Sequence, residues 1–464
     1  MRFELTDIFL ANLRAAINSQ NGAFVAEQLK ELYPPDIAEI FNELKIEEAK
    51  YLYTQLDEQV APDVLVELED DVRERFLASL TSKEIAEQFI DNMDSDDAAD
   101  VIAELPDDVQ GEVLSHMEDS GQASDIVDLL NYDEHTAGGL MRKEFVRVHV
   151  HRKALECVRE IREQAHDLEE VYAIYVVDDE EKLIGILHLK KLIVSPIRSI
   201  VADIYDPKII SVKTNTLAEE VANVMDKYKL VAIPVVDALG RLVGVITIDD
   251  VVDFRREEET EDVQKMGAME ALEEPYMSTP FLQMIRKRAG WLIILFLGET
   301  LTATAMGFFQ DQIAKAVILA LFIPLIISSG GNSGSQASTL IIRALALGEI
   351  TIRDWWKIVK KEFSTGLVIG LILGVIGYIR VAAWSYFISS YGPNWQLIAF
   401  SVSFSLVGVV MWGTLMGSLL PLLLKRLGLD PAVSSAPFVA TLVDVTGLII
   451  YFSVSIMFLK GILL

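Results

Sequence analysis

The sequence predicts a multidomain membrane protein with three parts: an all-α helical superhelix, a small α/β tandem repeat and a five-span α-helical transmembrane domain. Charge divides the 464 residues first, because residues 1–280 hold 27 basic and 62 acidic side chains (net −35) and residues 281–464 hold 13 and 7 (net +6). No charged residue stands between Lys315 and Arg343 or between Arg380 and Lys425. Such stretches exceed the roughly 20 apolar residues that cross a bilayer, so a purely soluble protein is excluded.

Composition excludes further classes. The acidic first part argues against a nucleic-acid partner, since phosphate binding needs clustered Lys and Arg. A single cysteine, Cys157, cannot form an internal disulfide framework. The stretch from Met1 to Leu10 carries charges and no apolar signal-peptide core. We therefore expect the acidic part to stay in the cytoplasm.

The helical part, residues 1–140, contains 8 basic and 34 acidic residues. A loose motif recurs in it, at Pro34–Ile40, Ser82–Gln88 and Ser95–Val101. Each copy begins with an N-cap residue or a first-turn proline and then carries acids that favour the positive end of a helix dipole. Short capped helices in series predict a superhelical stack. For most of these acids, capping and solubility are sufficient reasons.

Residues 141–260 contain an internal repeat. The first copy consists of Tyr172–Asp178 and Lys182–Leu187. The second copy lies 59 positions later and consists of Val231–Asp237 and Arg241–Ile246. Each copy is typical of strand, turn, strand and helix, preceded by a helix at Ala154–Gln164 or Leu217–Tyr228. The pair resembles tandem CBS domains, regulatory modules that often bind adenine nucleotides or sense ions. The resemblance implies that Thr247 and Asp250 hold ribose hydroxyls and that ATP is a candidate ligand.

The first repeat has other residues, His188 and Lys191, at the places of Thr247 and Asp250, so we expect at most one nucleotide site per chain. After the repeat, Lys265 to Pro280 is predicted to form a helix that leads into the membrane, within a connecting segment at 261–283. No His/Cys metal spacing, Walker loop or nucleophile elbow occurs, so nothing in the sequence indicates catalysis.

Five spans are predicted in the transmembrane domain, residues 284–464: Gly290–Phe309, Ala316–Leu347 with a break inside, Phe363–Phe387, Gln396–Leu424 and Ala436–Leu459. Basic residues precede the first span, surround the second connection and end the fourth span. The positive-inside rule then places the N-terminal part inside and the C-terminus outside.

Three features inside the spans are costly and suggest function. Asp444 lies near the middle of the fifth span, where a carboxylate costs at least about 2.5–3.5 kcal/mol, so we expect an ion or proton site. An ion pair with Arg380 is the alternative. Glu299 fits either a structural hydrogen bond or a place in the pore. The polar run Ser328–Gln336, which contains Asn332, predicts a broken helix, with close packing by small residues as the alternative.

Taken in order, these parts resemble the MgtE family of magnesium channels. The resemblance is specific at Asp133–Met141, at Pro324–Leu345 and at Pro437–Gly447. It implies a homodimer with a connecting plug helix, and a fifth-span acid, here Asp444, that faces the pore and holds hydrated Mg²⁺. With it, the pore residues expected by motif are Thr441, Gly447 and Asn332.

The resemblance also implies regulatory Mg²⁺ between the helical and CBS domains. The expected acids are Asp63, Asp96 and Asp100 facing Asp250, Asp253, Glu258, Glu261 and Asp262. Two departures from the family pattern are Ala436 in place of an asparagine, and Leu217 and Lys229 in place of acids. These departures affect the expected number of regulatory ions.

Elementary chemistry points to the same function. Mg²⁺ sheds water reluctantly, so its pore should hold the hydrated ion through carboxylates and hydroxyls. Acidic lobes repel one another and divalent cations between them would offset the repulsion, so high internal Mg²⁺ should close the gate. We expect the homodimer in the plasma membrane. The alternatives are a membrane-anchored nucleotide sensor and a proton-coupled transporter that uses Asp444 or Glu299.

Overall fold

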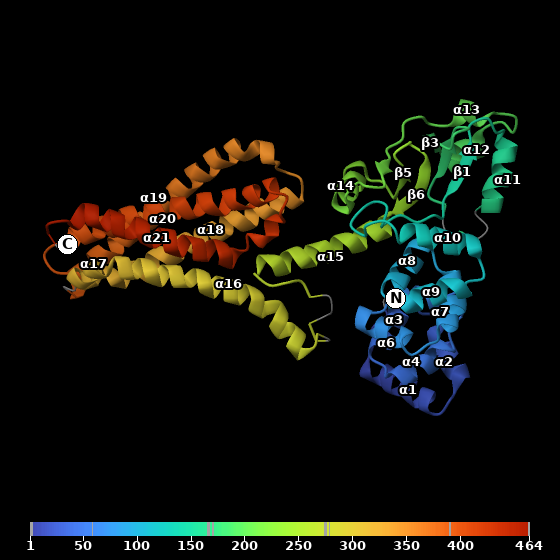
Figure 1. Ribbon diagram of the computed structural model, residues 1–464, viewed down its shortest axis with the longest axis horizontal. Coiled ribbons are helices and arrows are strands. Elements are labelled where there is room, and N and C mark those ends of the chain that lie inside the picture. Colours follow the sequence, from blue (N-terminus) through green and yellow to red (C-terminus); the bar gives the residue numbers. More distant parts are fainter. Residues whose placement is uncertain are drawn as a thin grey trace. The chain divides into compact units, whose positions relative to one another are not determined.

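The computed structural model describes residues 3–57, 59–164, 168, 171–272, 276–277, 279–388 and 391–462. The chain divides into two compact units (Figure 1). The first takes in Met1–Arg256 and Glu273–Ser278, and the second takes in Glu257–Leu272 and Thr279–Leu464. The helical part and the tandem repeat therefore belong to one unit, and the membrane helices to the other.

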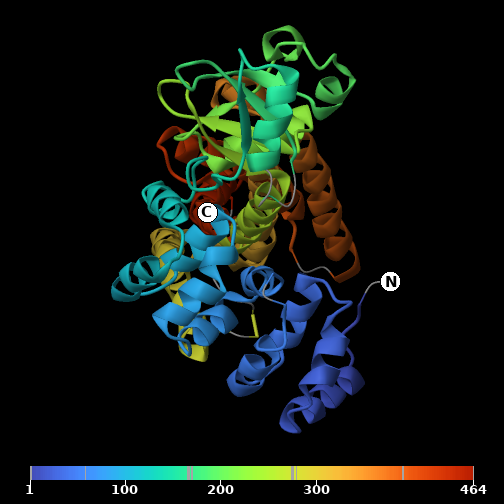
Figure 2. The same ribbon diagram turned by 90° about the vertical axis from the view of Figure 1, so that its right-hand side faces the viewer.

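Short helices in series make up the first part of unit 1, as Figures 1 and 2 show. They are α1 (Asp7–Asn18), α2 (Gly22–Leu29), α3 (Pro34–Asn42), α4 (Ile46–Tyr53), α5 (Ala61–Val66), α6 (Asp70–Leu77), α7 (Ser82–Gln88), the 3-10 turn η1 (Ile90–Asn92), α8 (Ser95–Ala103), α9 (Asp107–His116) and α10 (Ser120–Leu129). The three predicted motif copies begin α3, α7 and α8, so these helix starts are confirmed. At α7 the start is a capping box: Thr81 N–H donates to Glu84 Oε2 at 2.8 Å, and Glu84 N–H donates to Thr81 Oγ1 at 3.2 Å.

Two three-stranded sheets form the tandem repeat, and each contains the predicted pair of strands and one further strand that precedes the first helix of the copy. The first repeat consists of β1 (Val146–His149), α11 (Ala154–Gln164), β2 (Ile174–Val177), β3 (Leu183–Leu187), α12 (Leu189–Val194) and α13 (Val201–Ile204). The second consists of β4 (Val212–Lys213), α14 (Ala218–Tyr228), β5 (Ala232–Val236), β6 (Leu242–Thr247) and the first half of α15 (Ile248–Met266). Both sheets have the same order, with a parallel pair followed by an antiparallel pair.

One hydrophobic core joins the helical part to the second repeat. Ile126 and Leu129 of α10 belong to the same buried cluster as Ile246 of β6 and Val251 of α15. Backbone hydrogen bonds reinforce the junction, since Arg142 N–H donates to the Val245 carbonyl at 2.8 Å. Burial of apolar surface stabilises a protein by about 25 cal/mol per Å². The shared core therefore stabilises the packing of the helical part against the second repeat.

The predicted helix from Lys265 to Pro280 is wrong. In the described residues α15 ends at Met266, and the next helix begins only at Phe281. Gly267 and Ala268 follow the last turn, and Ala268 has φ of +57°, a left-handed conformation that ends a helix. Pro280 is the N-cap of the next helix. The described residues of the connection, 267–272, 276–277 and 279–280, are therefore not helical.

Unit 2 contains five helices long and apolar enough to cross a membrane among the described residues, which confirms the five predicted spans. Its elements are α16 (Phe281–Phe308), α17 (Gln310–Lys315), the 3-10 segment η2 (Val317–Phe322), α18 (Ile323–Ala346), η3 (Ile352–Asp354), α19 (Trp355–Ile388), α20 (Trp395–Arg426), η4 (Pro431–Val433) and α21 (Ala436–Leu459). Helix α20 packs against α18, α19 and α21, and α16 packs against α21.

The predicted break inside the second span is wrong, because α18 is helical throughout Ser328–Gln336. Glycines in this run let the backbone of α18 come into direct contact with the backbone of α20. A methyl group on Gly413 would lie 2.3 Å from the Gly330 carbonyl oxygen, and one on Gly417 would lie 2.0 Å from that of Gly334. The alternative, close packing by small residues, explains this run.

Candidate ion pathway and ion sensor

Asp444 lies in the third turn of α21, half-buried, beside α18. A methyl group on Gly331 of α18 would lie 3.8 Å from Asp444 Oδ1 and 3.4 Å from the Ala440 side chain. These are ordinary van der Waals distances, so the carboxylate lies against the Gly331 turn of α18. The structure leaves the carboxylate partly accessible, as an ion site requires.

Glu299 approaches the same place from α16. The preceding residue, Gly298, touches α21 so closely that a methyl group there would lie 2.8 Å from Thr441 Cγ2. Thr441 is one turn before Asp444 on α21, so Glu299 lies at the same level of the bundle, and its carboxylate is close enough to repel that of Asp444. Glu299 itself is exposed in the single chain. Two acids from two helices therefore share one region of the membrane domain.

The other predicted pore residues have different surroundings. Thr441 donates its hydroxyl to the Pro437 carbonyl at 3.0 Å, within its own helix. Gly447 is buried against α20, where a methyl group would lie 3.0 Å from Val409 Cγ1, so packing explains the glycine. Asn332 is exposed on α18, and its Nδ2 lies 3.5 Å from Ser328 Oγ. Their parts in an ion pathway stay predictions.

Arg380 does not pair with Asp444 in the part of the chain that the structure describes. Its guanidinium stacks over the ring of Trp384, 3.3 Å from the centroid, and the charge that acts on Asp444 is that of Glu299. A cation over an indole face is a stable arrangement by itself. The alternative of an Asp444–Arg380 ion pair is therefore wrong.

A second acidic site joins α8 to the start of α15 within unit 1. Asp96 is 8% exposed, and burial raises its pKa well above the ordinary value, with Asp250, Asp97 and Asp94 adding repulsion. Burial likewise raises the pKa of Asp97 to about 7, with Asp250 the next cause. Arg142 opposes these shifts and binds Asp94 at 2.5 Å. One guanidinium thus faces several carboxyl groups. The excess of negative charge favours either protonation of a carboxyl or binding of a cation.

Asp100 and Asp250 complete this group, which we call the α8–α15 acid cluster: Asp94, Asp96, Asp97, Asp100 and Asp250. Loss of water, followed by repulsion from Glu104 and Glu134, raises the pKa of Asp100 to about 7, although the residue stays on the surface. Burial also raises the pKa of Asp250. The structure therefore brings together three of the predicted regulatory acids.

The remaining predicted regulatory acids lie elsewhere. Asp63 is exposed on α5, and Asp253 is exposed on α15, where it repels Glu67. The second half of α15 belongs to unit 2 and carries the last three, Glu258, Glu261 and Asp262. Among the described residues, no group of three or more His, Cys, Asp or Glu side chains has the geometry of a metal site.

Thr247 and Asp250 bind each other. The Thr247 hydroxyl donates to Asp250 Oδ2 at 2.6 Å and its backbone N–H donates to the same oxygen at 3.0 Å, which caps the start of α15. Thr247 is fully buried. Both residues therefore have a structural role in this arrangement, and ribose binding by them stays a prediction.

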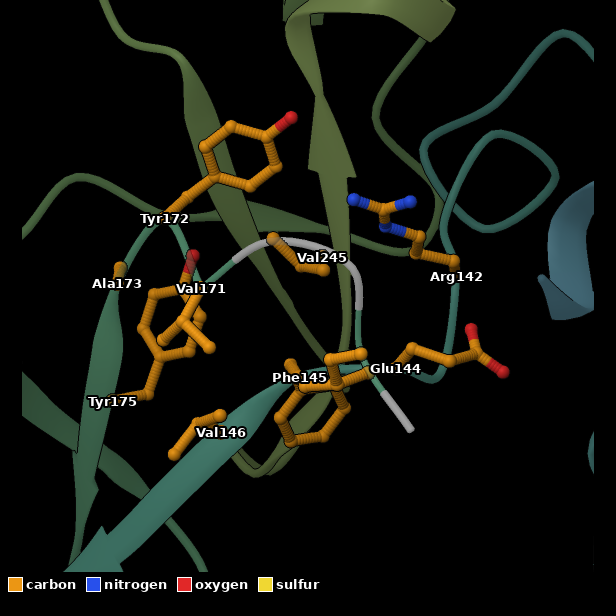
Figure 3. A pocket seen from close by; sticks show the side chains of 10 residues that line it. Arg142, Glu144, Phe145, Val146, Val171, Tyr172, Ala173, Tyr175 and Val245 are labelled. Carbon is orange, nitrogen blue, oxygen red and sulfur yellow. The ribbon is translucent and has the colours of Figure 1, made fainter. Parts of the chain in front are cut away.

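A hollow between the two repeats lies beside these residues without including them (Figure 3). Tyr172 and Tyr175 line one side of it, Phe145 its base and Arg142 the opposite side, with Val245 from the second repeat between them. The Tyr175 hydroxyl and Arg142 Nε are buried without a hydrogen-bond partner. The hollow thus combines aromatic faces with unused polar atoms.

Sequence reasoning missed Asp97, Arg142 and the pairing of Glu299 with Asp444. Asp97 is adjacent to Asp96 and lies within the motif copy Ser95–Val101, whereas Arg142 is the residue just after the motif that ends at Met141. The spacing along the chain gave no sign of their contacts, because Arg142 and Asp94 are 48 residues apart.

Comparison with known proteins decides the family. Three family models match: MgtE, described as a divalent cation transporter, at residues 323–454; the MgtE intracellular N domain at 32–135; and the CBS domain at 137–196 and 201–257. A magnesium transporter MgtE from Thermus thermophilus is 36% identical over 97% of this chain and 98% of its own length. This chain belongs to the MgtE family. Its predicted fold class, with a helical N domain, a CBS pair and five membrane-spanning helices, is thereby confirmed.

A further curated relative and two solved structures are also similar to this chain. A magnesium transporter MgtE from Enterococcus faecalis is 33% identical over 72% of this chain and 71% of its own. Among solved structures, the cytosolic domain of the Mg²⁺ channel MgtE in complex with ATP is 34% identical, with 53% of this chain and 99% of that chain covered and a TM-score of 0.49. The soluble part of a magnesium transporter is 28% identical, with 54% and 97% covered and a TM-score of 0.49.

Proposed function

We propose that this chain is a Mg²⁺-selective channel or transporter that imports Mg²⁺ across the plasma membrane as a homodimer. The observation that carries the proposal is Asp444, a partly accessible carboxylate in the third turn of the apolar helix α21. The end-to-end similarity to a magnesium transporter supports it. A carboxylate at that depth is costly without a cation or proton to bind.

Hydrated Mg²⁺ is the ion that suits this site. It keeps several of its waters and prefers oxygen ligands, so one carboxylate per chain, doubled by a second copy, would hold it without stripping its shell. Helix α16 is consistent with a dimer, because only 6% of its most apolar stretch is buried within the chain. Lipid and a partner chain would cover the rest.

The α8–α15 acid cluster is the proposed sensor of cytoplasmic Mg²⁺. Its carboxyls are crowded and short of positive charge, so a divalent cation would relieve their repulsion and hold the helical part against the CBS pair. High internal Mg²⁺ would then favour a closed gate. ATP is a proposed modulator, because the matched CBS pair is a module of the kind that binds adenine nucleotides.

The proposed topology places the acidic domains and the loop before α21 on the cytoplasmic side. Lys265, which precedes the first span, bonds to Asp430, which lies between the fourth and fifth spans, at 2.8 Å. A direct contact requires both segments to lie on one side of the membrane, and basic residues at the end of α20 favour the inside. With five spans the C-terminus would lie outside.

Mg²⁺ flux into liposomes that contain only the purified full-length protein tests the proposal. Flux without a pH gradient supports a channel, and flux that requires the gradient supports the proton-coupled alternative. Absence of flux under both conditions would leave the nucleotide-sensor reading. Asp444→Asn should abolish most of the flux, and the matched control Asp311→Asn, at an exposed acid of α17, should not.

A further inference from the structure

An ion triad connects the end of α15 to the segment that precedes α21. Lys265 Nζ bonds to Asp430 Oδ2 at 2.8 Å and to Glu261 Oε1 at 2.7 Å. Glu261 is one turn before Lys265 on α15, whereas Asp430 is 165 residues away along the chain. One ammonium therefore holds two carboxylates that come from distant segments of unit 2.

Both partners of this contact are set in fixed surroundings. Only 28% of the Lys265 side chain is exposed, and burial acts to lower its pKa, but the hydrogen bonds to Asp430 and Glu261 raise it above the ordinary value. Asp430 uses its other oxygen to accept the Ala432 N–H at 2.8 Å. The triad thus differs from a mobile surface pair, which contributes little.

The segment after Asp430 passes directly into the pore helix. The 3-10 turn η4 leads to Ser434 and Ser435, which are fully buried. On α18, Ser338 donates to the Ser434 carbonyl at 2.8 Å and Ser335 donates to the Ala436 carbonyl at 3.0 Å. A displacement at Asp430 therefore acts on the first turn of α21, two turns before Asp444.

At its other end, α15 begins in the α8–α15 acid cluster. Asp250 is in the first turn and Lys265 in the last turn of one unbroken helix (Figure 1). The sensor acids and the triad are thus joined by a single secondary-structure element.

We propose that Lys265 is the coupling residue through which α15 acts on α21. Its ammonium, held between Glu261 and Asp430, ties the end of α15 to the start of the pore helix. This contact uses a cation supplied by the chain itself, so it persists whether or not a metal ion is bound there. The inference rests on the proposed function, because it concerns how Mg²⁺ sensing reaches the ion pathway.

The first test measures Mg²⁺ flux against internal Mg²⁺ for full-length variants in liposomes. Lys265→Gln removes the ammonium, and Asp430→Asn keeps an oxygen for the Ala432 cap while removing the charge. Each variant should raise the internal Mg²⁺ concentration that gives half-inhibition of flux by about fivefold or more, or abolish the inhibition. Lys265→Arg should follow the wild type.

Lys357→Gln is the matched control, because Lys357 forms an exposed pair with Asp354 at the same 2.8 Å distance. Its curve should overlay the wild type. Curves for Lys265→Gln and Asp430→Asn that also overlay the wild type would overturn the proposal.

A second test does not depend on transport. Spin labels at Val263→Cys and Leu429→Cys, both exposed, report the distance between the end of α15 and the loop before α21. The native Cys157 is fully buried, and burial raises its pKa to about 11, so it should stay unlabelled. The distance distribution should be narrow with Lys265 and broad with Lys265→Gln.

Distance distributions of equal width in the two proteins would overturn the proposal that Lys265 holds the end of α15 to the loop before α21. If the wild type transports no Mg²⁺, the proposed function fails, and the distance measurement still decides whether Lys265 holds the two segments together.

Discussion

Neutralising Asp97 should stabilise unit 1 of this protein. The residue is in the first turn of α8, where an acid normally stabilises a helix through the dipole. Here burial and the charge of Asp250 raise its pKa to about 7. The folded state therefore disfavours the ionised carboxylate, and Asp97→Asn should remove that cost.

The size of the effect follows from the pKa shift. Raising the pKa from 3.8 to about 7 corresponds to about 4 kcal/mol, at about 1.4 kcal/mol per unit. Loss of the dipole contribution subtracts up to about 1 kcal/mol, which leaves about 3 kcal/mol in favour of the variant.

The sign fixes the pH window. Below pH 4 the carboxyl is protonated in the folded and unfolded states, so the cost is absent. The wild type then loses stability as the pH rises from about 4 to about 7, and the gap to the variant is constant above that.

Urea denaturation of residues 1–272 at pH 4, 6 and 8, in EDTA and in millimolar Mg²⁺, measures the gap. Mg²⁺ should narrow it, because a cation bound to the cluster stabilises the ionised wild type. Asp108→Asn, at an exposed acid in the first turn of α9, is the matched control and should be neutral or slightly destabilising. A variant no more stable than the wild type at pH 8 in EDTA would refute this account of the cluster.

Three further predictions concern transport and packing. Asp444→Asn should fold and dimerise yet lose most Mg²⁺ flux, and Glu299→Gln should lose less if Glu299 only modulates the site; an equal loss would place Glu299 in the pathway. Gly417→Ala should destabilise the membrane domain by about 2 kcal/mol or more, because the methyl group would lie 2.0 Å from a backbone carbonyl, and an unchanged melting temperature in detergent would contradict the packing. The third changes three sensor acids to asparagine, namely Asp96, Asp100 and Asp253. If ion bridging dominates, channels with this triple change should stay open at high internal Mg²⁺, and if repulsion dominates they should stay shut at low Mg²⁺; an open-probability curve identical to the wild type would reject both.

The sequence by itself determined the parts of this protein that depend on local or periodic signals. Charge-free stretches predicted five spans, helix caps predicted the starts of α3, α7 and α8, and the 59-residue repeat predicted the paired sheets. Asp444 was identifiable because a carboxylate in an apolar span has a large cost wherever it lies. These inferences need no knowledge of which segments meet.

Tertiary structure decided whatever depends on contacts between distant segments. The polar run of α18 was predicted to break the helix, but its glycines meet those of α20 and allow two unbroken helices to touch. The same reason applies to Arg142 beside Asp94 and to Lys265 beside Asp430, which are 48 and 165 residues apart. Charge and residue type indicate what a side chain can bind, whereas the packing of the helices determines which partner it meets.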